Sequence, residues 1–185
     1  LKNVLKISET EAVFNEGSVD LDFRVESNGN ANMIFVDGGN DHVNIGTATD
    51  LGGVLNVSGT AVIQTADNTD TLSLISTDAD DNSGPNLRMY RNSGSPADND
   101  VIGQIQFEGR NDNSQDVVYN DISMKIQDAS DGTEDGIIRF RNMQAGTLRQ
   151  YLSTSGTETV FNEDSVDIDF RVESNDNANM LFVDG

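Results

Sequence analysis

One histidine and a large excess of carboxylates are the residues of this chain whose types could support chemistry. His42 is the single histidine among 185 residues, and there is no cysteine. Nucleophilic hydrolases place a base, most often histidine, beside a serine or a cysteine. His42 lies in the run Asn40-Asp41-His42-Val43-Asn44, next to the expected start of a strand, where a solvated side chain is the favoured interpretation. We therefore predict no nucleophilic catalytic residue.

The 32 Asp and Glu residues could in principle supply the acid and base of a glycosidase. With this many acids, however, almost any fold brings some pair together, so a close pair would carry no information. Carbohydrate clefts also use stacking aromatic rings, and this chain has no Trp and three Tyr, namely Tyr90, Tyr119 and Tyr151. The sequence therefore predicts that the protein is not an enzyme and has no catalytic residue.

The many Asp and Asn residues also raise the question of calcium, because hard cations prefer oxygen ligands. The run 78–84, Asp-Ala-Asp-Asp-Asn-Ser-Gly, spaces oxygens at alternate positions, but Ser83 and Met89 replace the glycine and the terminal glutamate of an EF-hand loop. The run Gly38-Gly39-Asn40-Asp41 faintly resembles a nonapeptide calcium roll, yet the tandem copies that a roll requires are absent. Neither run predicts a metal site.

A third acidic group could gather round an ion in a tight loop. It consists of Asp128, Asp131, Glu134 and Asp135. A solvated acidic hairpin is the simpler interpretation of these residues. We predict no cofactor and no metal-ligating residue within the chain, and calcium held between chains is the alternative that stays open.

The net charge limits the partners of the chain. Its 11 basic residues stand against 32 acidic ones, which gives a net charge of −21. Such a charge opposes binding to the phosphates of nucleic acid, which require a basic face. No run approaches the roughly 18 apolar residues that span a bilayer. We therefore expect no nucleic-acid partner and no insertion into membranes.

The elements that would position any site are expected to be β-strands. Leu21, Phe23 and Val25 alternate with charged residues, a period of two that places apolar side chains on one face. Turn-forming pairs such as Asn28-Gly29 and Asp131-Gly132 separate the alternating runs, and no apolar stripe has helical spacing. Similar alternation occurs at Val43/Ile45, Leu55/Val57, Leu72/Leu74, Leu87/Met89, Ile105/Phe107, Ile122/Met124/Ile126 and Ile138/Phe140. The sequence therefore predicts an all-β fold.

A long internal repeat organises the chain. Residues 13–38 align without gaps to residues 160–185, at an offset of 160 − 13 = 147 residues, and 22 of the 26 positions are identical. The four differences exchange apolar or turn-forming residues: Gly17/Asp164, Leu21/Ile168, Gly29/Asp176 and Ile34/Leu181. We therefore predict that residues 1–156 are one fibre repeat with a period of about 147 and its core match at 13–38, and that residues 157–185 start the next repeat.

Thin strips of apolar residues and dense turns suit an elongated fibrous repeat in which several chains share one core. We expect an intertwined homotrimeric β-helix or β-prism shaft, in which each chain supplies a strip of the core and the strand edges are covered. The alternative is a monomeric β-solenoid. A solenoid predicts a coil repeat of roughly 20 to 30 residues, which the sequence does not display.

Two segments resemble a known family. They are DFRVESNGNANMIFVDGGNDHVNIGT, residues 22–47, and SPADNDVIGQIQFEGRNDNSQDVVYNDISMKIQDASDGTEDGIIRF, residues 95–140. Both are similar to repeat regions of tail-fibre and appendage-fibre proteins of phages and related large viruses, especially marine ones. In such proteins, a phrase like Phe35-Val36-Asp37-Gly38 followed by residues 43–47 often precedes a C-terminal intramolecular chaperone domain of the endosialidase type. The resemblance covers most of the chain.

The resemblance implies a homotrimeric fibre on a virion, with a receptor-binding tip at its far end and no chemistry in the shaft. We therefore expect an extracellular structural protein involved in host attachment. Its partners would be copies of itself, other fibre or virion parts and, through the distal tip, host surface glycan. The family supplies no binding residues for the shaft. The weak candidates for glycan contact are Tyr90, Arg91 and Tyr119. A bacterial surface filament or adhesin and a glycan-cleaving tailspike are the alternatives.

Overall fold

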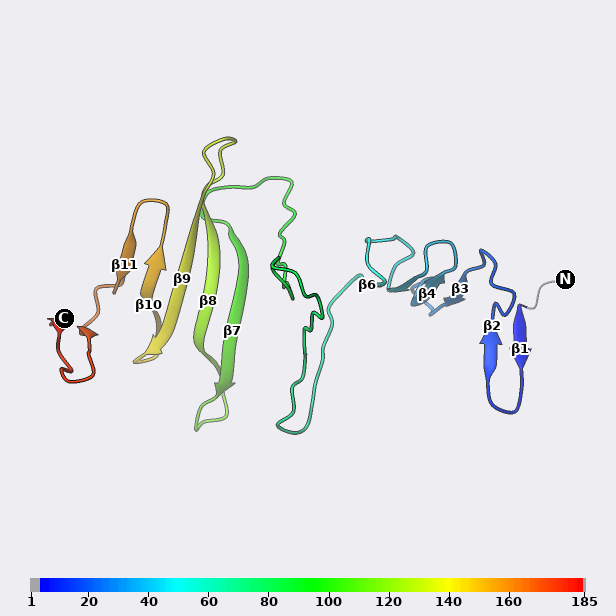
Figure 1. Cartoon of the computed structure of the whole chain (residues 1–185), viewed down its shortest axis with the longest axis horizontal. Helices are drawn as coiled ribbons and strands as arrows, with labels where there is room; N and C mark the ends of the chain where they lie inside the picture. Colours follow the sequence, from blue (N-terminus) through cyan, green and yellow to red (C-terminus); the bar gives the residue numbers. More distant parts are fainter. Residues whose placement is uncertain (1–3, 185) are drawn as a thin grey trace. The chain divides into compact units, whose positions relative to one another are not determined.

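The computed structural model describes residues 4–184, and all regular secondary structure in that range is β-strand. Within the described range, thirteen strands form four separate sheets (Figure 1). The chain divides into two compact units, Leu1–Ala79 and Asp80–Gly185. The prediction of an all-β fold is confirmed.

The first unit holds a hairpin and a four-stranded sheet. Its strands are β1 (Leu5–Ile7), β2 (Ala12–Phe14), β3 (Phe23–Val25), β4 (Ile34–Asp37), β5 (His42–Ile45) and β6 (Leu55–Val57). β1 pairs with β2, and the sheet has the order β3-β4-β5-β6, antiparallel except for the parallel pair β5 and β6. Parallel neighbours need a crossover connection, here residues 46–54. Gly46 and Gly52 give this tight connection its positive φ angles of 81° and 90°.

The second unit is built on a five-stranded antiparallel sheet followed by a small hairpin. Its strands are β7 (Val101–Arg110), β8 (Asp116–Asp128), β9 (Asp135–Gln144), β10 (Thr147–Thr154), β11 (Thr159–Phe161), β12 (Phe170–Val172) and β13 (Leu181–Val183). The sheet order β11-β10-β9-β8-β7 follows the sequence, so each strand pairs with the next along the chain. Gly132 and Gly146 have positive φ in two of the connecting turns. The hairpin pairs β12 with β13.

The two copies of the repeated sequence fold alike. β10 and β11 pair in the register of β1 and β2, shifted by 147 residues. Asn15 and Asn162 have positive φ angles of 63° and 66°, and each side chain bonds the backbone four residues on, at Val19 and Val166. Asparagine tolerates this left-handed conformation because its short side chain can hydrogen-bond locally. The same local sequence therefore forms the same turn in both places.

Two predicted strands are not formed. The alternating pairs Leu72/Leu74 and Leu87/Met89 lie in the long connection between β6 and β7, which contains no strand (Figure 1). Alternation determines which side chains share a face, but a strand also needs a hydrogen-bonding neighbour. No backbone–backbone hydrogen bond joins residues 60–77 to any other described residue. These two predictions are therefore wrong for the single chain.

Residues 4–184 of the single chain form no hydrophobic core. Among the described residues no apolar side chain is buried, and the buried side chains are all polar: Asn44, Asn56, Asp121, Ser123 and Ser153. The accessible surface is 14245 Å² for a mass of 20.0 kDa. Two separate globules that share this mass would expose only about 10,500 Å² together. The apolar residues of the sheets therefore remain in contact with water in the single chain.

Candidate functional site

An apolar row crosses all five strands of the large sheet. Register partners on neighbouring strands lie on the same face of a sheet. The row is Ile105, Ile122, Phe140, Leu152 and Phe161. None of these side chains is buried, and Phe161 is 53% exposed. A continuous apolar face that stays open to water is typical of an interaction surface.

The four-stranded sheet has an apolar face of the same kind. Eight apolar residues form two rows across it, Phe23, Val36, Val43 and Leu55 in one and Val25, Ile34, Ile45 and Val57 in the other. Leu55 is 66% exposed, and none of the eight is buried. Both sheets therefore present a face that one chain leaves uncovered.

Each copy of the repeat adds an aromatic pair beside an open hollow. The ring centroids of Phe14 and Phe23 lie 4.8 Å apart, and those of Phe161 and Phe170 lie 4.8 Å apart as well. Both pairs are tilted, with an interplanar angle of 44°, and their centroid separation lies within the range of interacting aromatic pairs. The hollows have volumes of about 590 and 490 Å³. Their phenylalanine linings extend the apolar faces.

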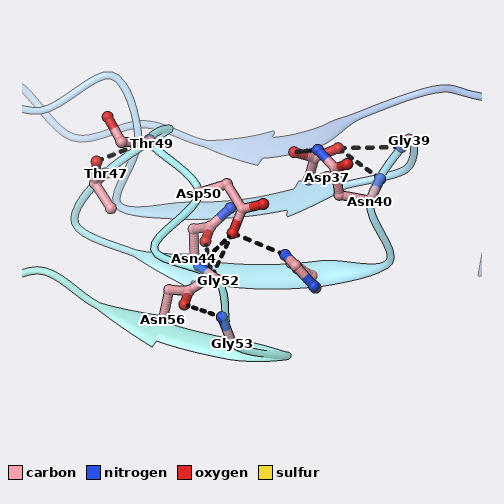
Figure 2. Close-up of polar contacts among 11 residues, drawn as sticks. Asp37, Gly39, Asn40, Asn44, Thr47, Thr49, Asp50, Gly52, Gly53 and Asn56 are labelled. Atoms are coloured by element: carbon pink, nitrogen blue, oxygen red, sulfur yellow. Dashed lines mark hydrogen bonds and ion pairs between the residues drawn. The ribbon is translucent and has the colours of Figure 1, made fainter.

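The opposite face of the four-stranded sheet holds a buried amide pair (Figure 2). Asn44 and Asn56 are register partners on the parallel strands β5 and β6 and are 0% and 5% exposed. Asn56 Nδ2 donates a hydrogen bond to Asn44 Oδ1 over 2.7 Å, and Gly53 N donates one to Asn56 Oδ1 over 3.0 Å. These bonds satisfy both amide oxygens, whereas Asn44 Nδ2 is buried without a hydrogen-bond partner among the described residues. The pair therefore stabilises the parallel step between β5 and β6.

Asp50 ties the crossover loop to strand β5 (Figure 2). Its Oδ1 accepts a hydrogen bond from Gly52 N over 2.7 Å and lies 2.9 Å from His42 Nδ1. The Gly52 amide holds the pKa of Asp50 below its usual value, and the hydrogen bond with His42 lowers that pKa further. None of the described hydroxyl groups hydrogen-bonds to the His42 ring. His42 thus anchors the crossover loop to β5 through Asp50.

A buried ion pair lies on the polar face of the five-stranded sheet. Asp121 on β8 is 2% exposed and is the register partner of Arg141 on β9. Arg141 Nε donates to Asp121 Oδ1 over 2.9 Å, Arg141 Nη2 bonds Oδ2, and Gln104 Nε2 donates to Oδ2 over 2.7 Å. Forked guanidinium–carboxylate bonds of this kind are strong and directional. They join strands β7, β8 and β9 on the face opposite the apolar row.

Arg139 lies beside this ion pair and lacks some of its hydrogen bonds. Burial lowers the pKa of Arg139, and the neighbouring charge of Arg141 lowers it further. Arg139 Nε and Ser123 Oγ are buried atoms without a hydrogen-bond partner among the described residues. The two residues are register partners on β9 and β8. The polar face therefore carries more buried hydrogen-bonding groups than the single chain satisfies.

The acidic runs considered as calcium loops form turns. Asp37 accepts hydrogen bonds from the side chain and the backbone of Asn40, and Asp128 accepts one from the backbone of Ser130. These hydrogen bonds hold the pKa values of Asp37 and Asp128 below the usual range. Asp80 accepts from Asn82 in the same way. Exposed positions are occupied by Asp131, Glu134 and Asp135. Across residues 4–184, no group of three or more acidic or histidine side chains is arranged to hold a metal ion.

The weak candidates for glycan contact do not form one site. Tyr90 is 67% exposed, with the Arg88 guanidinium 4.7 Å from the centre of its ring. Arg91 pairs with Asp100 over 3.0 Å. Tyr119 lies on β8 and is 40% exposed. No interaction among the described residues joins Tyr119 to Tyr90 or Arg91.

Sequence reasoning missed the buried polar residues. Asn44 and Asn56 stand in matching triplets, Val43-Asn44-Ile45 and Leu55-Asn56-Val57, twelve residues apart. An asparagine between two apolar strand residues at equal spacing is a signal that could have found this pair. Asp121 and Arg141 have no such signal, because their contact depends on the register that the β8–β9 turn sets.

Comparison of the chain with protein-family models, with curated proteins and with solved structures found no match. The residues that the structure describes include no helix long and apolar enough to cross a membrane. The fold and the two-faced sheets are therefore the basis on which a function can be argued.

Proposed function

We propose that this chain is a structural segment of an extracellular fibre, a viral tail or appendage-fibre shaft that assembles as a homotrimer and performs no catalysis. The observation that carries the proposal is that residues 4–184 bury no apolar side chain, although apolar rows cross both large sheets. Apolar burial is the dominant favourable term in folding. A chain that leaves its apolar side chains only partly buried gains the rest of this stabilisation when an assembly covers them.

The exposed area agrees with an obligate assembly. The chain exposes about 3,800 Å² more than two globules that share its mass would. Obligate interfaces bury roughly 2,000 to 5,000 Å². Three copies that turn their apolar faces towards a common axis cover these faces and leave the polar faces in water. The three chains together carry a net charge of −63, three times −21. Carboxylates that face outward keep these negative charges far from one another.

The proposed role is mechanical. Repeated units that stack in one dimension set the length of an object and hold its end away from its base. In this proposal the shaft carries a host-binding tip outside the cell, as part of a virion, and contacts other fibre or virion parts. The turns formed by the acidic runs and the anchored position of His42 support a segment without chemistry of its own.

The mass of the purified chain in solution tests the proposal. Light scattering is expected to give three times the chain mass of 20.0 kDa, and electron microscopy is expected to show thin rods. Adding a chelator tests the calcium alternative, because loss of the trimeric species would place a cation between chains. A compact and stable monomer would contradict the proposal.

A further inference from the structure

Residues 60–77 are an extended stretch without a partner in the chain. All of them are exposed except Thr65, which is half-buried. They form no strand, and no backbone–backbone hydrogen bond joins them to any other described residue. Val62 and Ile75 are 84% and 81% exposed. Water can hydrogen-bond these exposed backbone groups in the single chain, whereas an assembly that covers them has to supply hydrogen-bond partners from protein.

A turn in the middle of the stretch is already formed. Asp67 Oδ1 accepts hydrogen bonds from the side chains of Thr69 and Thr65, over 2.5 and 2.8 Å, and from the backbone amide of Thr69 over 3.0 Å. The bonds from Thr69, and then that from Thr65, lower the pKa of Asp67 to about 2. The turn joins two arms, residues 60–66 and 71–77. The stretch is therefore shaped before it finds a partner.

The composition of the arms favours strands. Val62, Ile63 and Ile75 are β-branched residues, which fit a pleated surface. Leu72 and Leu74 alternate with hydroxyl residues, so one face of that arm is apolar. The alternation that predicted a strand there is real, and the missing requirement is a hydrogen-bonding neighbour.

The charges identify the neighbour. The runs 60–66 and 71–77 contain no charged residue, in a chain whose net charge is −21 over 185 residues. In a homotrimer, three-fold symmetry places equivalent residues of the three chains at the same level around the axis, and like charges brought close together in a sheet are destabilising. Uncharged arms are what pairing with a second copy of the same segment requires. A basic partner protein would instead favour acidic arms.

From these observations we propose that residues 60–66 and 71–77 become β-strands that pair with the arms of other copies of this chain, so that this connection is the intertwined part of the shaft. The proposal rests on the proposed assembly and names the surface through which the chains exchange hydrogen bonds. In the assembly, the two large sheets contribute apolar faces that other chains cover, whereas the arms contribute backbone hydrogen bonds between chains. Both edges of each arm are open to such a ladder.

Hydrogen exchange of the full chain, measured on the sample used for light scattering, tests this inference. In the assembled protein the amides of residues 61–64 and 72–75 are expected to exchange as slowly as those of β8. Fast exchange of the arms in a trimeric assembly would overturn the inference and leave the proposed fibre standing. Slow exchange in a monomer would overturn both, because the pairing would then lie within one chain.

A charge placed in an arm gives a second test with a matched control. Ser73→Asp brings like charges together in the inter-chain ladder. We expect the protein concentration at which half of the chains are assembled to rise at least about tenfold. Asn68→Asp adds the same charge in the turn outside the arms, next to Asp67, and is expected to change this concentration less than about twofold. Equal effects of the two substitutions would contradict pairing through the arms.

Discussion

At the scale of single residues, the polar face of each sheet depends on a few buried side chains. Asp121 is a 2% exposed carboxylate held by Arg141 and Gln104. Taking a carboxylate out of water is costly unless charge and hydrogen bonds compensate it. Because Arg141 lies on the adjacent strand, the compensation also fixes the register between β8 and β9. The ion pair thus stabilises the register in which Ile122 and Phe140 share the apolar row.

Replacing Arg141 tests this role. Arg141→Met leaves the Asp121 carboxylate buried with Gln104 as its remaining side-chain partner, and we expect a loss of about 3 kcal/mol in the free energy of unfolding. The measurement is denaturant unfolding at fixed protein concentration. The double variant Asp121→Asn with Arg141→Met is the control, and it should recover more than half of the loss because no charge remains buried. Equal stability of Arg141→Met and the unmodified chain would contradict this account.

At the scale of elements, β5 and β6 form the parallel step of the first unit. The nine-residue crossover between them is held by Asp50, and the amides of Asn44 and Asn56 join the strands beneath it. The same strands carry Val43 and Leu55 on the opposite face. The amide pair therefore positions part of the apolar face.

Removing one amide should weaken this step. Asn56→Ala deletes the donor to Asn44 Oδ1 and the acceptor for the Gly53 amide, and we expect a loss of about 1–3 kcal/mol in the free energy of unfolding. Exposed Asn86 lies outside the first unit, and Asn86→Ala is the control, with a change below about 0.5 kcal/mol. Thermal unfolding at one protein concentration measures both variants. Similar changes in the two would contradict a structural role for the amide pair.

The sequence was sufficient for the strands whose neighbours follow them along the chain. Ile105/Phe107, Ile122/Met124/Ile126 and Ile138/Phe140 became β7, β8 and β9 because short turns place each run beside the next. Leu72/Leu74 has the same alternation but no in-chain neighbour, and periodicity does not contain that information. The buried Asp121–Arg141 pair escaped prediction for a related reason, since it depends on strand register.

At the scale of the whole molecule, the proposed fibre combines open apolar faces with high negative charge. Covering the apolar rows favours assembly, whereas bringing three chains of −21 together opposes it. The uncharged arms at 60–66 and 71–77 reduce this repulsion where the chains approach most closely, and carboxylates on the outer faces lie farther apart. The balance between the two effects should respond to ionic strength.

Salt is therefore expected to stabilise the assembly. Raising NaCl from about 0.1 M to about 1 M shortens the Debye length from about 10 Å to about 3 Å and screens the repulsion between chains. We expect the midpoint of thermal unfolding to rise by at least about 3 °C at constant protein concentration. Chloride is preferred to sulfate, which strengthens apolar burial by itself. A midpoint that falls with NaCl would show that attractive ion pairs dominate between the chains.

The identical folding of the two repeat copies has a consequence for how such a gene can change. The segments that encode residues 13–38 and 160–185 specify the same hairpin, β3–β4 in one copy and β12–β13 in the other, and the same turn at Asn15 and Asn162. Unequal recombination between them would insert or delete 147 residues and recreate an existing junction at the splice point. Genes of this kind can therefore lengthen or shorten their product by whole repeats, without first evolving a new junction between repeats.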